Sequence, residues 1–186
     1  MKQDNRGLSL VELIVVIAIM AVMIGIGILS ISLLFGTQAR GCVQNVSTML
    51  GETKTGCLSR FDETMTLSYR TKGTDKAITS DGYYAENYVY TINKDAASIP
   101  VGGSEIRRMG SKKVIITVYL SDGSNFELGT SRSVTISYNR STGAFDPVIV
   151  DGTQTDDYIE KITFASGART YTITMVQETG KHTVQG

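Results

Sequence analysis

The chain has 186 residues, and its 18 lysines and arginines balance 18 aspartates and glutamates, so the formal net charge is zero. This balance excludes a strongly basic nucleic-acid-binding protein, although a local basic patch stays open. With two cysteines and one histidine, the chain is not a disulfide-rich scaffold and offers little for a histidine metal site or a catalytic triad. Its length predicts one globular domain with an appendage.

An apolar stretch, Leu8–Phe35, dominates the sequence, and its only charge is Glu12. As a helix it would be roughly 42 Å long, which exceeds the ~30 Å hydrocarbon core of a bilayer. Residues 1–7 form a short polar leader with a lysine and an arginine, so the positive-inside rule places the N-terminus in the cytoplasm. We therefore predict a single-pass helix at 8–36, with the remainder of the chain on the far side of the cytoplasmic membrane.

Glu12 makes a plain signal anchor an incomplete explanation. A carboxylate inside the apolar layer costs up to roughly 3 kcal/mol, and such residues usually have a partner and a function. A secretory signal peptide is the other simple alternative, but its apolar core is shorter and precedes a small-residue cleavage site. A cut after Gly7 would give Leu8 a free amino group that can pair with Glu12 of the same helix or a neighbouring one, where the helix N-terminus also favours an acid.

The run RGLSLVEL at 6–13, which opens the long apolar helix, resembles the prepilin processing signal of type IV pilins and pseudopilins. The resemblance implies that a prepilin peptidase cuts after Gly7 and N-methylates Leu8. It also implies that Glu12 is the glutamate needed for fibre assembly. Two features depart from the family pattern, since the first mature residue is leucine where phenylalanine is frequent, and the apolar helix has no proline.

Two glycines lie in the apolar helix where many family members have a proline. Gly25 and Gly27 each weaken the helix by up to about 1 kcal/mol, so they can supply a point of local melting. The alternative is that they allow close packing of helices in the membrane. Both interpretations stay open.

Beyond the membrane, residues 37–60 predict an amphipathic outer helix. Apolar or small residues recur there at alternating steps of four and three, which is the stripe of a helix that packs on one face. The stripe consists of Ala39, Val43, Val46, Leu50, Thr53 and Cys57. Cys42 and Cys57 would lie about 22 Å apart on this helix, too far for a disulfide. Each is therefore either a small buried side chain or one half of a crosslink between subunits.

Residues 61–186 predict a β head domain with one antiparallel sheet, whose buried face the stripe of the outer helix covers, which makes the fold class α+β. Apolar and polar residues alternate at 114–120, 134–138 and 170–175, and turns follow at 122–123, 139–143 and 178–181. Shorter or weaker strand signals lie at 65–71, 84–92, 144–150 and 182–184, and 93–113 predicts an irregular loop with a short strand.

The head carries no motif typical of an enzyme, so we predict neither catalysis nor a cofactor. Asp151, Asp156 and Asp157 are the best carboxylate cluster; they would be calcium ligands in one interpretation and a solvated polar loop in the other. His182 is predicted to be an exposed strand residue. A basic cluster with four tyrosines nearby in sequence is the remaining feature. It is a DNA-binding surface in one interpretation and a solvated face beside core tyrosines in the other. The cluster consists of Arg107, Arg108, Lys112 and Lys113, and the tyrosines are Tyr83, Tyr84, Tyr88 and Tyr90.

The predicted function is that of a structural subunit of a type IV pilus or a type II secretion-like pseudopilus. The resemblance implies other pilin or pseudopilin subunits, the prepilin peptidase, an inner-membrane assembly platform and the membrane itself as partners. The subunit would leave the membrane for a surface or periplasmic fibre. The alternative is a minor or tip pilin, or a membrane-anchored head, that binds a ligand or DNA.

Overall fold

The computed structural model describes residues 10–59, 62–91, 99–100 and 105–186. At residues 25–35, 62, 89–91 and 99–100 it describes the backbone alone. The chain forms two compact units, Met1–Leu34 and Phe35–Gly186. One α-helix, α1 (Leu10–Ser59), contributes to both units and has 50 residues.

In the first unit, every described side chain of α1 from Leu10 to Ile24 is exposed, and almost all of them are apolar. A helix that is apolar on all sides needs an apolar environment or partner helices around it. Within the described residues, no helix combines the length and the hydropathy that a membrane crossing requires.

In the second unit, the predicted stripe of α1 is confirmed, because all six of its side chains are buried. Cys42 and Met49 extend the buried face. The one polar member, Thr53, is satisfied by donating its hydroxyl proton to the carbonyl oxygen of Met49 at 2.8 Å. The stripe therefore forms one wall of the core of the head.

The strands of the head form two antiparallel sheets. The first has the order β3-β2-β1-β7-β8-β9, and β4 also pairs with β2. Its strands are β1 (Asp62–Arg70), β2 (Gly82–Thr91), β3 (Ile99–Pro100), β4 (Glu105–Ser111), β7 (Ser133–Ser137), β8 (Ile149–Val150) and β9 (Thr153–Gln154).

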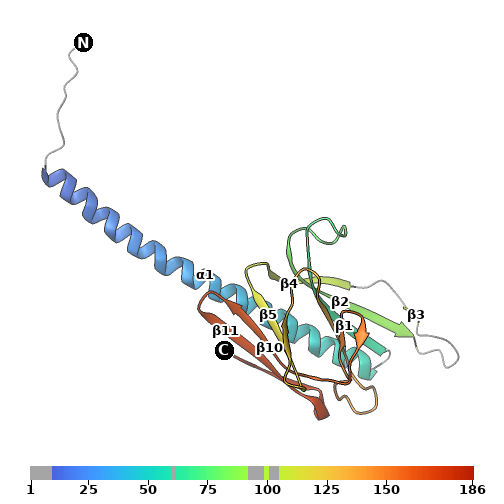
Figure 1. Cartoon of the computed structure of the whole chain (residues 1–186). Helices are drawn as coiled ribbons and strands as arrows, with labels where there is room; N and C mark the ends of the chain where they lie inside the picture. The colour runs from blue at the N-terminus through green and yellow to red at the C-terminus, as the bar shows by residue number, and fades with distance from the viewer. Residues whose placement is uncertain (1–9, 60–61, 92–98, 101–104) are drawn as a thin grey trace. The chain divides into compact units, whose positions relative to one another are not determined.

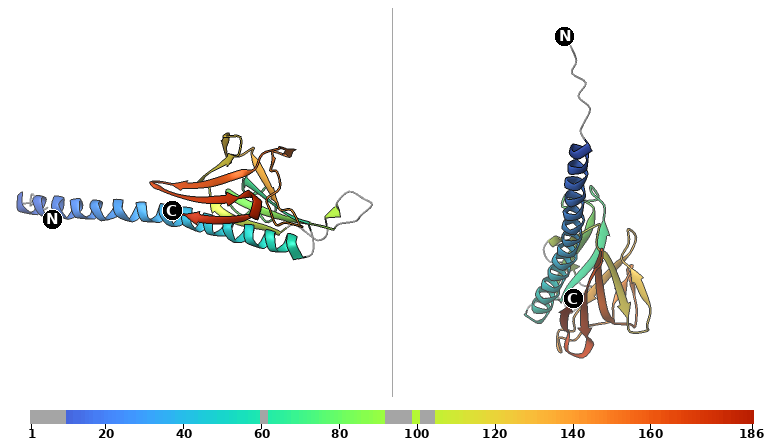
Figure 2. Two further views of the ribbon diagram at one scale, coloured as in Figure 1. Left: turned by 90° about the horizontal axis from the view of Figure 1, so that it is seen from below. Right: turned by 90° about the vertical axis from the view of Figure 1, so that its left-hand side faces the viewer.

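The second sheet has the order β12-β11-β10-β5-β6. Its strands are β5 (Ile115–Leu120), β6 (Asn125–Glu127), β10 (Ile159–Ser166), β11 (Arg169–Val176) and β12 (Lys181–Gln185). A short 3₁₀ helix, η1 (Gln177–Thr179), connects β11 to β12 and ends at Gly180, which has a positive φ of 57°. Figures 1 and 2 show the strands of the head alongside the outer part of α1.

The core lies between this part of α1 and the inner faces of both sheets. Its fully buried large side chains include Leu50 on the helix, Met65 and Leu67 on β1, and Ile116 and Phe164 in the second sheet. The α+β class with an antiparallel head is therefore confirmed. The single sheet that the sequence suggested is instead two, because strands distant in sequence pair with each other, such as β1 with β7 and β5 with β10.

Polar contacts tie the helix to the head along its outer part. The side chain of Asn45 donates to the carbonyl of Met109 at 3.1 Å, and Tyr138 Oη donates to the carbonyl of Leu50 at 3.1 Å. The amine of Lys54 donates to the carbonyl of Thr179 at 2.7 Å. These contacts reach β4, the residue that follows β7, and η1 between β11 and β12.

Two strand predictions need correction. The region 144–150 forms a strand only at Ile149–Val150, although an isolated bridge between Tyr138 and Phe145 closes the predicted loop at 139–143. Strand β10 has no counterpart among the predicted strands. Of the loop predicted at 93–113, residues 93–98 and 101–104 lie outside the described residues, and β4 occupies most of the rest.

Candidate functional site

The predicted assembly residue, Glu12, lies in the first turn of α1. Its neighbours Val11 and Leu13 are 68% and 52% exposed, so this ionisable group lies among exposed apolar side chains of the helix. The predicted cleavage and methylation residues, Gly7 and Leu8, lie outside the described residues.

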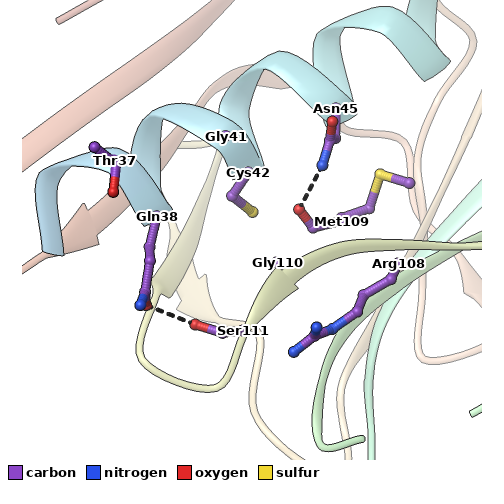
Figure 3. Close-up of a pocket in the computed structure, with 9 residues that line it drawn as sticks. All are labelled: Thr37, Gln38, Gly41, Cys42, Asn45, Arg108, Met109, Gly110 and Ser111. Carbon is purple, nitrogen blue, oxygen red and sulfur yellow. Dashed lines mark hydrogen bonds between the residues drawn. The ribbon is translucent and has the colours of Figure 1, made fainter. Parts of the chain in front are cut away.

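In the head, a groove separates α1 from β4, and Figure 3 shows the residues that line it. Its volume is about 290 Å³. The helix contributes Thr37, Gln38, Gly41, Cys42 and Asn45, and β4 contributes Arg108, Met109, Gly110 and Ser111. The floor is set by a close approach of the two elements, since a Cβ at Gly110 would lie 2.6 Å from the sulfur of Cys42.

Hydrogen bonds across this groove hold its two walls together. Ser111 Oγ donates to Gln38 Oε1 at 2.9 Å, and the Asn45 amide reaches the backbone of Met109. A second hollow of about 310 Å³ adjoins the first and shares Gln38, Arg108 and Ser111 with it. Residues Ser80, Asp81, Lys112 and Lys113 complete this second hollow.

The four residues of the predicted basic cluster divide between two environments. Arg107 lies 2.6 Å from Glu52 of α1 and 2.7 Å from Glu105, and these carboxylates raise its pKa, most of all by accepting its hydrogen bond to Glu105. Lys112 lies 3.6 Å from Asp81, and Arg108 is exposed. Three cations of the cluster therefore line the hollows, and the fourth braces β4 against the helix.

The tyrosines do not form the stacking surface that a single-stranded nucleic acid would need. Tyr83 and Tyr84 are 4% and 2% exposed, and burial raises the pKa of Tyr83 to about 12. Tyr88 is half-buried, and the side chain of Tyr90 lies outside the described part of the chain. The aromatic half of the DNA interpretation thus has no support among the described side chains.

Two of the three predicted calcium ligands, Asp151 and Asp157, accept hydrogen bonds within the head. Asp151, which has a positive φ of 52°, accepts a hydrogen bond from the backbone N–H of Ser133 at 2.7 Å. Asp157 accepts one from Ser121 Oγ at 3.3 Å, and Asp156 is exposed. Across the described ranges, no three His, Cys, Asp or Glu side chains gather in a way that could hold a metal ion.

Both cysteines are buried, and neither forms a disulfide. Cys57 Sγ donates to the carbonyl of Tyr138 at 3.0 Å, and burial raises the pKa of Cys42 to about 12. The prediction that they do not pair with each other is confirmed. The alternative of a crosslink between subunits requires an exposed thiol, which neither residue provides.

His182 lies in the predicted terminal hairpin, but it is half-buried rather than exposed. Its Nε2 shares a hydrogen bond of 2.9 Å with Ser47 Oγ of α1. Burial lowers the pKa of His182, and the nearby charge of Lys54 lowers it further, while the bond to Ser47 acts in the opposite direction. The folded head therefore favours the neutral imidazole.

This burial predicts a loss of stability in mild acid. Because the pKa of His182 is lower in the folded state than the ordinary value of ~6.5, the unfolded chain binds the proton more readily once the pH falls below that value. We expect the urea midpoint of the parent to fall from pH 7.5 to pH 5.0 by more than that of His182→Gln, which has no imidazole to protonate. Equal pH dependence of parent and variant would contradict this.

Sequence reasoning missed the groove and a buried polar chain at the far end of the helix. In that chain, Thr53 Oγ1 lies 3.2 Å from Asn87 Oδ1, and Asn87 Nδ2 donates to Glu63 Oε1 at 2.8 Å. Burial and the nearby Glu52 raise the pKa of Glu63. The only local signal was the polar Thr53 within an otherwise apolar stripe.

Comparison with protein families adds one finding, because residues 2–28 match the model of the prokaryotic N-terminal methylation motif. Neither the curated proteins nor the solved structures contain a match to the chain. The matched segment includes Gly7, Leu8 and Glu12, and the motif is the signature of type IV pilins and pseudopilins. It implies a structural protein that starts as a membrane-anchored precursor and assembles with other pilin subunits. The motif therefore indicates a type IV pilin-like precursor of the kind that prepilin peptidase processes.

Proposed function

We propose that the chain is a structural subunit of a type IV pilus or a type II secretion-like pseudopilus. The observation that carries the proposal is the position of Glu12, in the first turn of a helix whose described neighbours are exposed and apolar, within a matched methylation motif. Glu12 is the one ionisable group among the described apolar side chains of this segment, and cleavage after Gly7 would create an amine on Leu8 that can attract it.

The physical course of assembly follows from the solvent around the helix. In the bilayer, one apolar helix gains little from contact with another, since lipid is equally apolar. The attraction between Glu12 of one subunit and the amine on Leu8 of its neighbour supplies direction and register. Once the helices leave the membrane together, they bury one another's apolar side chains, which stabilises the core of the fibre.

The proposed topology is a single membrane pass with the leader in the cytoplasm and the head outside. We further propose that the subunit meets the prepilin peptidase and an inner-membrane assembly platform before it enters a surface or periplasmic fibre. The exposed apolar side chains of α1 between Leu10 and Ile24 support a lipid environment before assembly.

The test is the N-terminal residue and mass of the protein recovered from membranes and from sheared fibres. We expect a chain that begins at Leu8 and carries one extra methyl group. Gly7→Val should leave the precursor uncut, because a β-branched side chain then occupies the cleaved position, whereas Asn5→Ala in the leader should be processed normally. Recovery of a chain that begins at Met1, in cells with an active prepilin peptidase, would contradict the proposal.

A further inference from the structure

The head has a basic end and an acidic end, which lie at opposite ends of strand β5. At the start of β5, the turn from β4 carries Lys112 and Lys113, and Ser166 Oγ donates to the carbonyl of Lys113 at 3.3 Å. At the other end, Leu120 pairs with Ile159. The six residues of β5 separate the two ends by roughly 20 Å.

The basic end is formed by the two adjoining hollows described above. Arg108, Lys112 and Lys113 line them, and Asp81 is the only carboxylate among the lining residues. Lys112 and its partner Asp81 are 63% and 39% exposed, so this ion pair is open to solvent. Figure 3 shows Arg108 on the wall opposite the helix. The end therefore carries an excess of positive charge around a hollow surface.

The acidic end is formed by two segments that hydrogen bonds hold side by side. The backbone N–H of Ser121 donates to the carbonyl of Tyr158 at 2.8 Å, and the N–H of Tyr158 donates to Ser121 Oγ at 3.0 Å. These bonds bring the turn after β5 next to the start of β10. Asp122, Asp156 and Glu160 are exposed there, and Asp157 is half-buried beside them. The adjacent cation, Lys161, lies 4.6 Å from the centre of the Tyr119 ring.

We propose that the basic end of one head receives the acidic end of the next copy of this chain. The proposal rests on the proposed function, because it concerns how the heads contact each other in the fibre. Opposite charges at opposite ends give a heterologous contact, in which two different surfaces of the same molecule meet. Repeated without closure, such a contact produces an open filament, so the charge arrangement of the head fits the assembly that the helix drives.

A second copy fits this site better than DNA does. A nucleic-acid surface needs several cations along a phosphate backbone, and a single strand also needs aromatic faces for its bases. The hollows contain three cations and one carboxylate, and Tyr83 and Tyr84 are buried. The chain as a whole has no net charge, which does not favour binding to DNA. A second copy of the chain, in contrast, offers an acidic surface that complements the basic end.

The contact is expected to depend on the helices. Pairs of exposed charges contribute little individually, so isolated heads should not associate strongly. Within a fibre, packed helices hold neighbouring heads at a high effective concentration, and weak charge pairs then suffice to set the contact. The test therefore uses the full chain in assembled fibres.

The first measurement is crosslinking of the variant Arg108→Cys/Asp156→Cys in sheared fibres with a short bis-maleimide. We expect a ladder of dimers and higher oligomers, because the two positions lie on facing ends of neighbouring heads. The matched control is Arg108→Cys/Thr183→Cys, whose second thiol lies in the middle of β12 and is exposed. The parent, with both cysteines buried, should give no ladder. A ladder no stronger than that of the control would overturn the proposal.

The second measurement is charge reversal. Arg108→Glu and Asp156→Lys are each expected to lower the yield of fibres by about tenfold, because each reversal turns an attraction that recurs at every contact along the fibre into a repulsion. Added salt should restore part of the yield, because it screens that repulsion. The double variant should recover most of the yield, because the swapped charges again attract. Equal losses in the double variant and the single variants would contradict a direct contact between these ends.

The outcomes separate this proposal from the one it rests on. If the parent is cut, methylated on Leu8 and assembled, but reversal leaves the fibres unchanged, the contact between the ends is wrong and the subunit function stands. If the parent is neither processed nor assembled, both proposals are wrong. If Arg108→Glu weakens the retention of a single-stranded oligonucleotide on the fibres and leaves their yield intact, the basic end binds nucleic acid instead.

Discussion

Replacing Glu12 with alanine is expected to lower the yield of fibres by at least about tenfold, while insertion into the membrane and processing continue. The reason is the proposed pair between this carboxylate and the amine on Leu8 of a neighbouring subunit. Glu12 is the only charge in the apolar stretch Leu8–Phe35, so no other side chain there can replace it in the pair. In surroundings of low dielectric, a pair of this kind exceeds the ~1.4 kcal/mol that a tenfold change in an equilibrium requires. The measurement is the amount of the protein in sheared fibres relative to the amount in membranes.

Two controls make this experiment specific to the charge. Val16→Ala, one helical turn beyond Glu12, removes apolar surface but no charge, so it should lower the yield of fibres by less than Glu12→Ala does. Mass spectrometry of the membrane fraction must show that Glu12→Ala is still cut and methylated at Leu8. If Glu12→Ala entered fibres as well as the parent does, the charge pair would have no part in assembly.

Phe164→Ala is expected to destabilise the head by about 3–5 kcal/mol, which approaches the whole stability of many domains. Phe164 is fully buried on β10, the central strand of the second sheet, and it pairs with Ile116 on one side and Tyr171 on the other. Its removal leaves a cavity that three strands line. The measurement is urea unfolding of the full chain in detergent, followed by tyrosine fluorescence, since the chain has nine tyrosines and no tryptophan.

The matched control lies one strand away in the same sheet. Ile115 is 49% exposed at the start of β5, so Ile115→Ala opens no cavity and should cost less than about 1 kcal/mol. A loss below 1 kcal/mol in Phe164→Ala would mean that the second sheet does not close over the core at β10.

The outer helix was predictable because its signal is local. Six buried side chains between Ala39 and Cys57 repeat with the period of one helix, and the sheets only had to supply the opposing wall. Strand β10 shows the opposite case. A bulge between Ile159 and Lys161 places the buried Ile159 and Ile162 three residues apart, which breaks the alternation by which a strand is recognised.

The candidate functional residues also include one part that the sequence predicts and one part that it does not. The methylation motif is a run of consecutive residues, so the sequence alone indicated it, and the match at residues 2–28 confirmed the resemblance to pilins and pseudopilins. The groove forms where Gln38 meets Ser111, two residues that are far apart in the chain and ordinary in type. No local sequence pattern predicts this contact, because it depends on how β4 packs on the helix.

The polar contacts along α1 have a mechanical consequence. Asn45, Leu50 and Lys54 are bonded to the head at successive turns of the helix, and each bond involves a backbone carbonyl on one side. A pulling force along the helix axis would load these bonds in shear, all at once, instead of opening them one after another. The buried stripe lies parallel to them and would resist the same displacement. The head should therefore yield to tension along its helix only at forces that break many contacts together.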